Sequence, residues 1–326
     1  MTRMANTFAP TAIRTALGAD LGGTKVAVGA VDEKQRVLDR WNEPTCDLDT
    51  ATLLDLVESM LRTALERHPT AAAIGLGLPC AIDNDRGVAL NAVNLPLVDV
   101  PIRDLLAERL GVPVLLDNDA NLAALAEHRF GAACGTRDAV VLTVGTGVGG
   151  GVVMDGEVFR ASGTAPEIGH IVIDADGPPC QGTCPNNGCV EALASGTALG
   201  REGRAAAETN PNSALGKALA EGMDIDGRVV TKAALGGDSV AEDVVALIGK
   251  RLGVAVASLA NIFAPDIFVV GGGVAAAGEL LFAPIRSELH RRALPPQNMT
   301  PVVGAWLGPD AGMIGAAAMA LEAPRR

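Results

Sequence analysis

The sequence has very few aromatic side chains. It contains no tyrosine, six phenylalanines and two tryptophans among 326 residues, yet its hydrophobic fraction is 48%. Its cores are therefore expected to consist mainly of Ala, Val and Leu. No apolar run approaches the roughly 20 residues needed to span a bilayer. The first 17 residues lack the apolar segment and cleavage site of a secretory signal. These absences predict a cytoplasmic protein without a membrane partner, with a frayed tail up to Leu17.

Positive charge is also scarce. Lysine and arginine together number 26 against 38 acidic residues, so the net charge is −12. This charge argues against a protein that coats nucleic acid or an anionic membrane. It leaves small anionic ligands open, because backbone N–H groups can bind them. The length predicts about two domains.

Cysteine is rare but clustered. Three of the six cysteines fall in the stretch Ser162–Glu191. Proline and glycine interrupt the segment around them, which predicts a loop at 180–189. Three thiols and one imidazole can form a closed tetrahedral zinc shell, although the C-x3-C-x4-C spacing is unusual. The predicted ligands are His170, Cys180, Cys184 and Cys189; the alternative is three free thiols in a tight loop. The metal would bring the polar side chains of Glu167 and Glu191 to one point.

A glycine turn near the N-terminus follows Asp20. Apolar residues flank Gly22, Gly23, Thr24 and Lys25 on both sides, which predicts a β-hairpin. The glycines allow close approach of the backbone to a ligand, and Lys25 beside them favours phosphate. Asp20 is a candidate to hold a metal ion or its water. The alternative is a plain hairpin turn.

Strands and helices alternate along the chain, which predicts an α/β sheet. Asn118 and Asp119 follow one strand directly, where open α/β sheets bind ligands. Asp119 is predicted to accept the proton of a substrate hydroxyl, with Asn118 bound to a neighbouring hydroxyl; the alternative is a helix N-cap. Helices are predicted at 51–68, 102–110, 122–130, 241–263, 278–293 and 313–321, and strands at 73–78, 112–116, 139–144, 151–159 and 267–270.

A second glycine turn contains Gly145, Thr146 and Gly147. With Gly150 it matches G-x-G-x-x-G, so a nicotinamide dehydrogenase is an alternative. That fingerprint must open a helix, whereas here a second strand follows. Strand, glycine turn and strand therefore occur twice, which predicts a duplicated fold that grips one nucleotide between its halves.

Together these motifs resemble the ROK family of sugar kinases and repressors, within the actin-like, hexokinase-like ATPase superfamily. The resemblance extends from about Leu17 to the C-terminus. The matching segments are 20–25, Asn94-Leu-Pro96, 118–121, 143–147, Glu167-Ile-Gly-His170, Gly188-Cys-Val-Glu191 and 270–274.

The resemblance implies a fold, a site and ligands. The fold would be two actin-like (ribonuclease H-like) α/β domains, 1–118 plus 309–326 and 119–308, with a nucleotide and sugar cleft between them. Asp119 would be the base, and Asn118, Glu167, His170 and Glu191 would bind the sugar. Gly272 and Gly273 would lie under the adenine and ribose. The implied ligands are ATP, Mg²⁺ and a structural Zn²⁺, in a homodimer or homotetramer.

The sequence departs from the family pattern at two places. The first cysteine of the loop is displaced by two residues, to Cys180, and Cys80 stands where the family has glycine. A tighter pocket at Cys80 favours glucose, so a glucokinase is the leading hypothesis. The alternatives are a kinase for another hexose or an N-acylhexosamine (fructose, N-acetylmannosamine or N-acetylglucosamine) and a sugar-responsive repressor. The repressor is disfavoured because too few residues precede the first strand for a winged helix.

Overall fold

The computed structural model describes residues 14–34, 36–92, 95–160, 166–182 and 184–323. Asn94 of the predicted sugar-loop motif and most of the N-terminal tail lie outside these residues. The tail ends earlier than predicted, because strand β1 already begins at Thr15.

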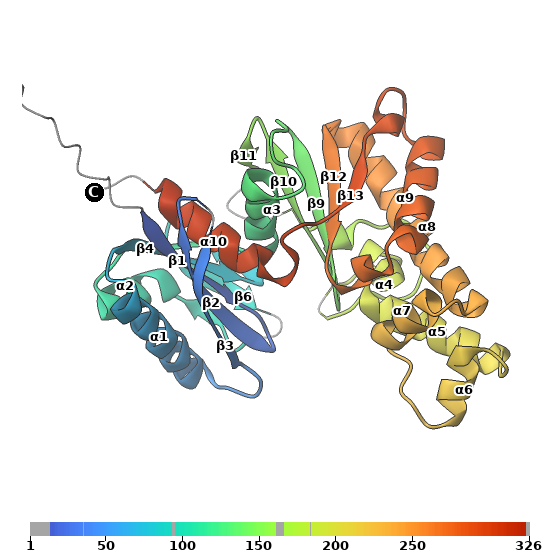
Figure 1. Ribbon diagram of the computed structural model, residues 1–326, viewed down its shortest axis with the longest axis horizontal. Coiled ribbons are helices and arrows are strands. Elements are labelled where there is room, and N and C mark those ends of the chain that lie inside the picture. The colour runs from blue at the N-terminus through green and yellow to red at the C-terminus, as the bar shows by residue number, and fades with distance from the viewer. Residues whose placement is uncertain (1–13, 35, 93–94, 161–165, 183, 324–326) are drawn as a thin grey trace, which may run out of the picture.

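The first lobe is built on a five-stranded sheet of order β3-β2-β1-β4-β8. Its strands are β1 (Thr15–Leu21), β2 (Lys25–Asp32), β3 (Val37–Pro44), β4 (Ala71–Leu78) and β8 (Val114–Asn118). Helices α1 (Thr50–Arg67) and α2 (Ile102–Leu110) cover one face of this sheet (Figure 1). A small separate sheet joins β5 (Cys80–Asp83), β6 (Val88–Ala92) and β7 (Val98–Val100).

The second lobe repeats the same sheet pattern, in the order β11-β10-β9-β12-β13. Its strands are β9 (Ala139–Val144), β10 (Val148–Met154), β11 (Glu157–Val158), β12 (Ile267–Gly271) and β13 (Val302–Gly304). In each sheet the first three strands form an antiparallel meander and the other two run parallel to the first strand. The prediction of a duplicated α/β fold is therefore confirmed.

Helices fill the rest of the second lobe. They are α4 (Val190–Ala194), α5 (Gly196–Thr209), α6 (Ala214–Ala220), α7 (Gly227–Leu235), α8 (Ser239–Phe263) and α9 (Glu279–Arg292). Single 3₁₀ turns occur at η1 (Ile168–His170), η2 (Gly273–Ala277), η3 (Gln297–Met299) and η4 (Gly308–Asp310). Helix α8 has 25 residues and contains an 18-residue window with a mean hydropathy of 1.5, so by length and composition alone it could cross a membrane, although charged residues interrupt it and no continuous apolar run approaches 20 residues. Over half of its apolar window is buried in the core of this lobe, as in core helices generally.

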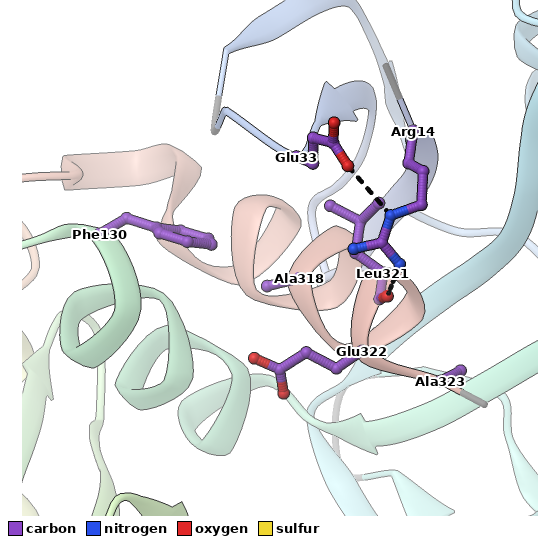
Figure 2. A pocket seen from close by; sticks show the side chains of 7 residues that line it. All are labelled: Arg14, Glu33, Phe130, Ala318, Leu321, Glu322 and Ala323. Atoms are coloured by element: carbon purple, nitrogen blue, oxygen red, sulfur yellow. Dashed lines mark hydrogen bonds and ion pairs between the residues drawn. The ribbon is translucent and has the colours of Figure 1, made fainter. Parts of the chain in front are cut away.

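Two helices lie between the sheets (Figure 1): α3 (Asp119–Phe130) and α10 (Ala311–Glu322). Helix α3 packs on β9 and β10 and on α10, and α10 packs on β1 and β4. The helix predicted at 313–321 therefore packs on the first lobe. Figure 2 shows how its far end is held: the Arg14 guanidinium donates to the Glu33 carboxylate and to the Leu321 carbonyl.

Candidate active site

Parallel strands of the first lobe bring two acidic positions to the same edge of the sheet. In the β1–β4 and β4–β8 registers, Asp20 lies opposite Gly77, and Gly77 lies opposite Asp117, one residue before Asn118. Helix α3 then begins with Asp119. The side chain that caps α3 is that of Asn118, whose Oδ1 accepts from the backbone N–H groups of Ala120 and Asn121. The alternative that Asp119 is the N-cap was therefore wrong.

The pKa of Asp119 is strongly perturbed. Burial of the carboxylate, together with the negative charges of Asp20 and Glu167, raises this pKa from 3.8 to about 7, against a backbone hydrogen bond from Ala120. Burial also raises the pKa of Asp20, while Lys25 partly opposes that effect. A carboxylate with a pKa near neutrality has the property expected of a general base.

Cys80 lies close to the Asp119 carboxylate, and its side chain packs into the hydrophobic core of the first lobe. Its side chain is buried, and burial followed by the charge of Asp119 raises the thiol pKa to about 12. The Cys80 carbonyl receives a 3.5 Å contact from the Asn118 Nδ2. The amide oxygen of Asn118 is committed to the helix cap, so only its nitrogen is available to a ligand.

The second glycine turn is a hairpin between β9 and β10, as predicted, which removes the dinucleotide-fingerprint alternative. The Gly145 N–H donates to the Gly147 carbonyl across the turn. Glu191, in the first turn of α4, accepts from the Val148 N–H at 2.9 Å. A Cβ at Gly147 would lie only 2.3 Å from the Glu191 Oε2, so the glycine is needed for this contact.

The predicted metal ligands converge. The ligand atoms of His170, Cys180, Cys184 and Cys189 all lie within 4.8 Å of one another. The Cys180 Sγ lies 3.5 Å from the His170 Nδ1, and the Cys184 and Cys189 Sγ atoms are 3.9 Å apart. The unusual spacing of Cys180 therefore does not keep its thiol out of the cluster. Glu167 lies at the start of the same 3₁₀ turn as His170, with an exposed side chain.

A hollow of about 960 Å³ opens in the second lobe next to the glycine turn. It contains three residues predicted to bind nucleotide, Gly145, Thr146 and Gly273. A Cβ added at Gly145 or Gly273 would meet no protein atom within 4 Å, so protein packing alone does not require glycine there. Gly272 is required, since its φ is +87° and a Cβ would overlap the Val144 backbone.

Sequence reasoning missed most of the lining of this hollow. It comes from α5, from α7 with the residues on either side of it, and from η2. The lining residues not predicted are Gly196, Thr197, Gly200, Arg201, Asp224, Ile225, Asp226, Gly227, Arg228, Thr231, Lys232, Leu235, Gly236, Val274 and Ala276. The Thr197 hydroxyl donates to the Thr146 carbonyl, and the Gly196 N–H donates to the Gly145 carbonyl. The N-terminus of α5 therefore supports the glycine turn.

The duplicated sheets, each with a glycine hairpin between its first two strands, define a two-lobed actin-like α/β protein. Residues 16–323 match the ROK family, and the chain belongs to that family. A glucokinase from Streptomyces coelicolor is 36% identical over 94% of this chain and 97% of its own length. The structure of a ROK family glucokinase from Streptomyces griseus, in complex with glucose and AMPPNP, superposes with a TM-score of 0.83 at 36% identity, covering 95% of this chain and all of that one. A xylose repressor from Caldicellulosiruptor bescii is 31% identical over 74% of this chain but only 60% of its own length.

Proposed function

We propose that this protein is an ATP-dependent glucokinase that converts glucose to glucose 6-phosphate. The observation that carries the proposal is the set of carboxylates around the strand ends of the first lobe. The charges of Asp20 and Glu167, together with burial, raise the pKa of Asp119 to about 7. The similarity to glucokinases over nearly the whole chain supports the same function.

In the proposed reaction, Asp119 is the catalytic base. Its carboxylate accepts the proton of the sugar 6-hydroxyl as that oxygen bonds to the γ-phosphorus of ATP and the bond to the ADP oxygen breaks. Phosphoryl transfer depends mainly on positioning and charge neutralisation, so one well-placed base is sufficient. The Asp119 Oδ1 accepts from the Ala120 N–H, which fixes the carboxylate relative to α3.

The two glycine turns are the proposed phosphate sites. The N–H groups of Gly22 and Gly145 donate within their own turns, to the carbonyls of Lys25 and Gly147. The N–H groups of residues 23–24 and 146–147 would hold the phosphate oxygens, and Lys25 would add a positive charge. Gly273, open to the hollow, and Gly272 beside it would lie under the adenine and ribose. Asp20 would hold Mg²⁺ or its water, and the ion, when bound, would neutralise phosphate charge.

The sugar hydroxyls would face side chains from both lobes. We assign them to the Asn118 Nδ2, to Glu167, to His170 and to the Glu191 oxygen that Val148 does not occupy. Because Glu191 also contacts the glycine turn, the sugar and phosphate sites share one residue. Closure of the lobes over the sugar would exclude water and limit ATP hydrolysis.

The four-residue cluster is the proposed zinc site. A tetrahedron with zinc–sulfur bonds of about 2.3 Å has edges of about 3.8 Å, and the observed contacts of 3.5 and 3.9 Å are close to that value. The His170 Nδ1 and three thiolates would complete a closed shell. The ion would be structural, and it would fix the imidazole so that its Nε2 faces the sugar.

We further propose a division into 1–118 plus 309–326 and 119–308, with the zinc loop at 180–189. The cytoplasm supplies ATP and keeps thiols reduced for a metal. A homodimer or homotetramer is expected. None of these assignments involves nucleic acid or a membrane.

A sugar panel tests the proposed function. Glucose, fructose, mannose, N-acetylmannosamine and N-acetylglucosamine are each incubated with ATP and Mg²⁺, and ADP release is followed in a coupled assay. The proposal expects glucose to give the highest kcat/KM. A preference for another sugar selects the other hexose or N-acylhexosamine kinase of the family, and sugar binding without turnover selects the repressor.

A further inference from the structure

Glu127, near the end of α3, is a buried carboxylate to which the reaction above gives no role. Its residue is 1% exposed. Oε1 accepts from the Leu307 N–H at 2.8 Å, and Oε2 accepts from the N–H groups of Ala132 at 2.8 Å and Trp306 at 3.2 Å. Within the described residues, the three hydrogen-bond donors to this carboxylate are therefore all backbone N–H groups. A Cβ at Gly131 would lie 2.0 Å from Oε2, so the chain leaves space for this carboxylate.

The segment that Glu127 holds connects the two lobes for the second time. It follows β13 of the second sheet and leads directly into α10, which packs on the first sheet. Gly308 lies within the segment with a φ of +57°. On the far side of this glycine, the Asp310 carboxylate pairs with Arg40 on β3. The connection is thus fixed on one side by Glu127 and on the other by the first lobe.

The first turn of α10 contacts the proposed active site. A Cβ at Gly312 would lie 2.5 Å from the Asp20 Oδ2, so the helix backbone lies directly against the carboxylate that we assign to Mg²⁺. A shift in the start of α10 would therefore move or release Asp20. Errors of about 1 Å in the placement of reacting groups can lower turnover about a hundredfold.

We infer that Glu127 is a positioning residue for the kinase reaction: it fixes the second connection between the lobes and so seats the first turn of α10 against Asp20. The inference rests on the proposed function, because it concerns the role that we assign to Asp20. It expects Glu127 to affect turnover and Mg²⁺ dependence rather than affinity for the sugar, whose proposed ligands Asn118, Glu167, His170 and Glu191 lie outside the connection and outside α10.

The substitution Glu127→Gln tests the inference. Glutamine has the same shape, but in either orientation its NH₂ group faces at least one backbone N–H donor. We expect kcat to fall about tenfold to a hundredfold, the Mg²⁺ concentration for half-maximal rate to rise several-fold, and the KM for glucose to stay within about twofold. Trp306 provides a direct signal, because in a Trp41→Phe background it is the only tryptophan. Its emission anisotropy should fall when its backbone N–H loses the hydrogen bond to the Glu127 carboxylate.

Glu322→Gln is the matched control. This carboxylate lies at the other end of α10 (Figure 2). It pairs with Arg129 and is exposed, so its loss should leave kcat and Mg²⁺ dependence unchanged. If Glu127→Gln fails to fold, Gly312→Ala decides, because the added methyl displaces Asp20 directly and should lower kcat and raise the Mg²⁺ requirement. A wild-type protein that phosphorylates no sugar overturns the proposed function. An active wild type whose folded Glu127→Gln or Gly312→Ala variant keeps its kcat and Mg²⁺ dependence overturns this inference alone.

Discussion

Replacing Asp119 by asparagine should abolish most of the activity and yet stabilise the protein. Loss of a general base lowers turnover by roughly 10²–10⁴, while sugar affinity should stay within a few-fold. Stability should rise because the folded protein raises the pKa of this carboxylate from 3.8 to about 7. Above pH 7, that difference in pKa corresponds to a loss of about 4 kcal/mol in the free energy of unfolding. Since Asp119 remains partly accessible to solvent, screening reduces the expected gain to about 2 kcal/mol.

The sign of the effect fixes its pH dependence. The folded state binds the Asp119 proton more tightly than the unfolded state. The contribution of this proton to the free energy of unfolding is therefore fully present below pH 3.8 and is lost as the pH rises to about 7. The two proteins should therefore be equally stable near pH 3.8 and differ most above pH 7. Urea unfolding at several pH values, without ligands, measures the difference.

Asp266 provides a control of opposite sign. The backbone N–H groups of Asp138 and Arg137 lower the pKa of Asp266. The wild type should therefore be more stable to unfolding than Asp266→Asn at neutral pH, and this difference in stability should be lost as the pH falls through the lowered pKa of Asp266. Equal stability of Asp119→Asn and wild type at every pH, or near wild-type turnover of the variant, would refute the role given to Asp119.

Four further outcomes are expected. The kcat/KM for glucose should fall about tenfold per pH unit below about pH 7, because Asp119 must be ionised to accept a proton, and a flat profile from pH 5 to 8 would contradict this. Elemental analysis should find about one zinc per chain and less in Cys180→Ser; zinc-free protein that stays folded and active would contradict a structural ion. The kcat/KM for glucose should exceed those for N-acetylmannosamine and fructose at least about tenfold, the size of one lost polar contact, measured at one ATP concentration. Gly147→Ala should raise the KM values of both sugar and ATP, because its methyl would displace the Glu191 carboxylate that contacts both proposed sites, and a change in only one KM would count against the shared contact.

Local patterns in the sequence were sufficient for the first hairpin, for the strands β4, β8, β9, β10 and β12 and for most long helices, whereas β3, β5, β6, β7 and β13 were not predicted. Helix α2 occupies the predicted residues, and α1, α8, α9 and α10 start within two residues of the predicted positions. The segment predicted as a strand at 151–159 contains the Asp155-Gly156 turn, which separates β10 from β11 and has positive φ at both residues. These elements have regular apolar periodicity or strong turn residues, which are properties of the sequence itself.

Helices α5 and α7 had no such signal, and the hollow next to the second glycine turn was missed with them. Glycines at 196, 200 and 203 interrupt the helical pattern of α5 and resemble loop residues. In the structure a Cβ at Gly203 would lie 2.2 Å from the Val230 Cγ2, so the glycine allows α5 and α7 to pack closely. Such a glycine has a tertiary cause, and one sequence does not reveal the neighbour that requires it.

The same reasoning connects the scarcity of aromatic side chains with the position of α10. A Cβ at Gly18 of β1 would lie 2.0 Å from the Met313 carbonyl, and one at Gly75 of β4 would lie 1.9 Å from the Ala316 carbonyl. The helix backbone thus lies almost directly on the sheet, at a distance that only glycine permits at these two strand positions. Because α10 lies this close, its first turn can reach the Asp20 carboxylate. A bulkier residue at Gly18 or Gly75 would separate the helix from the sheet and from the proposed active site together.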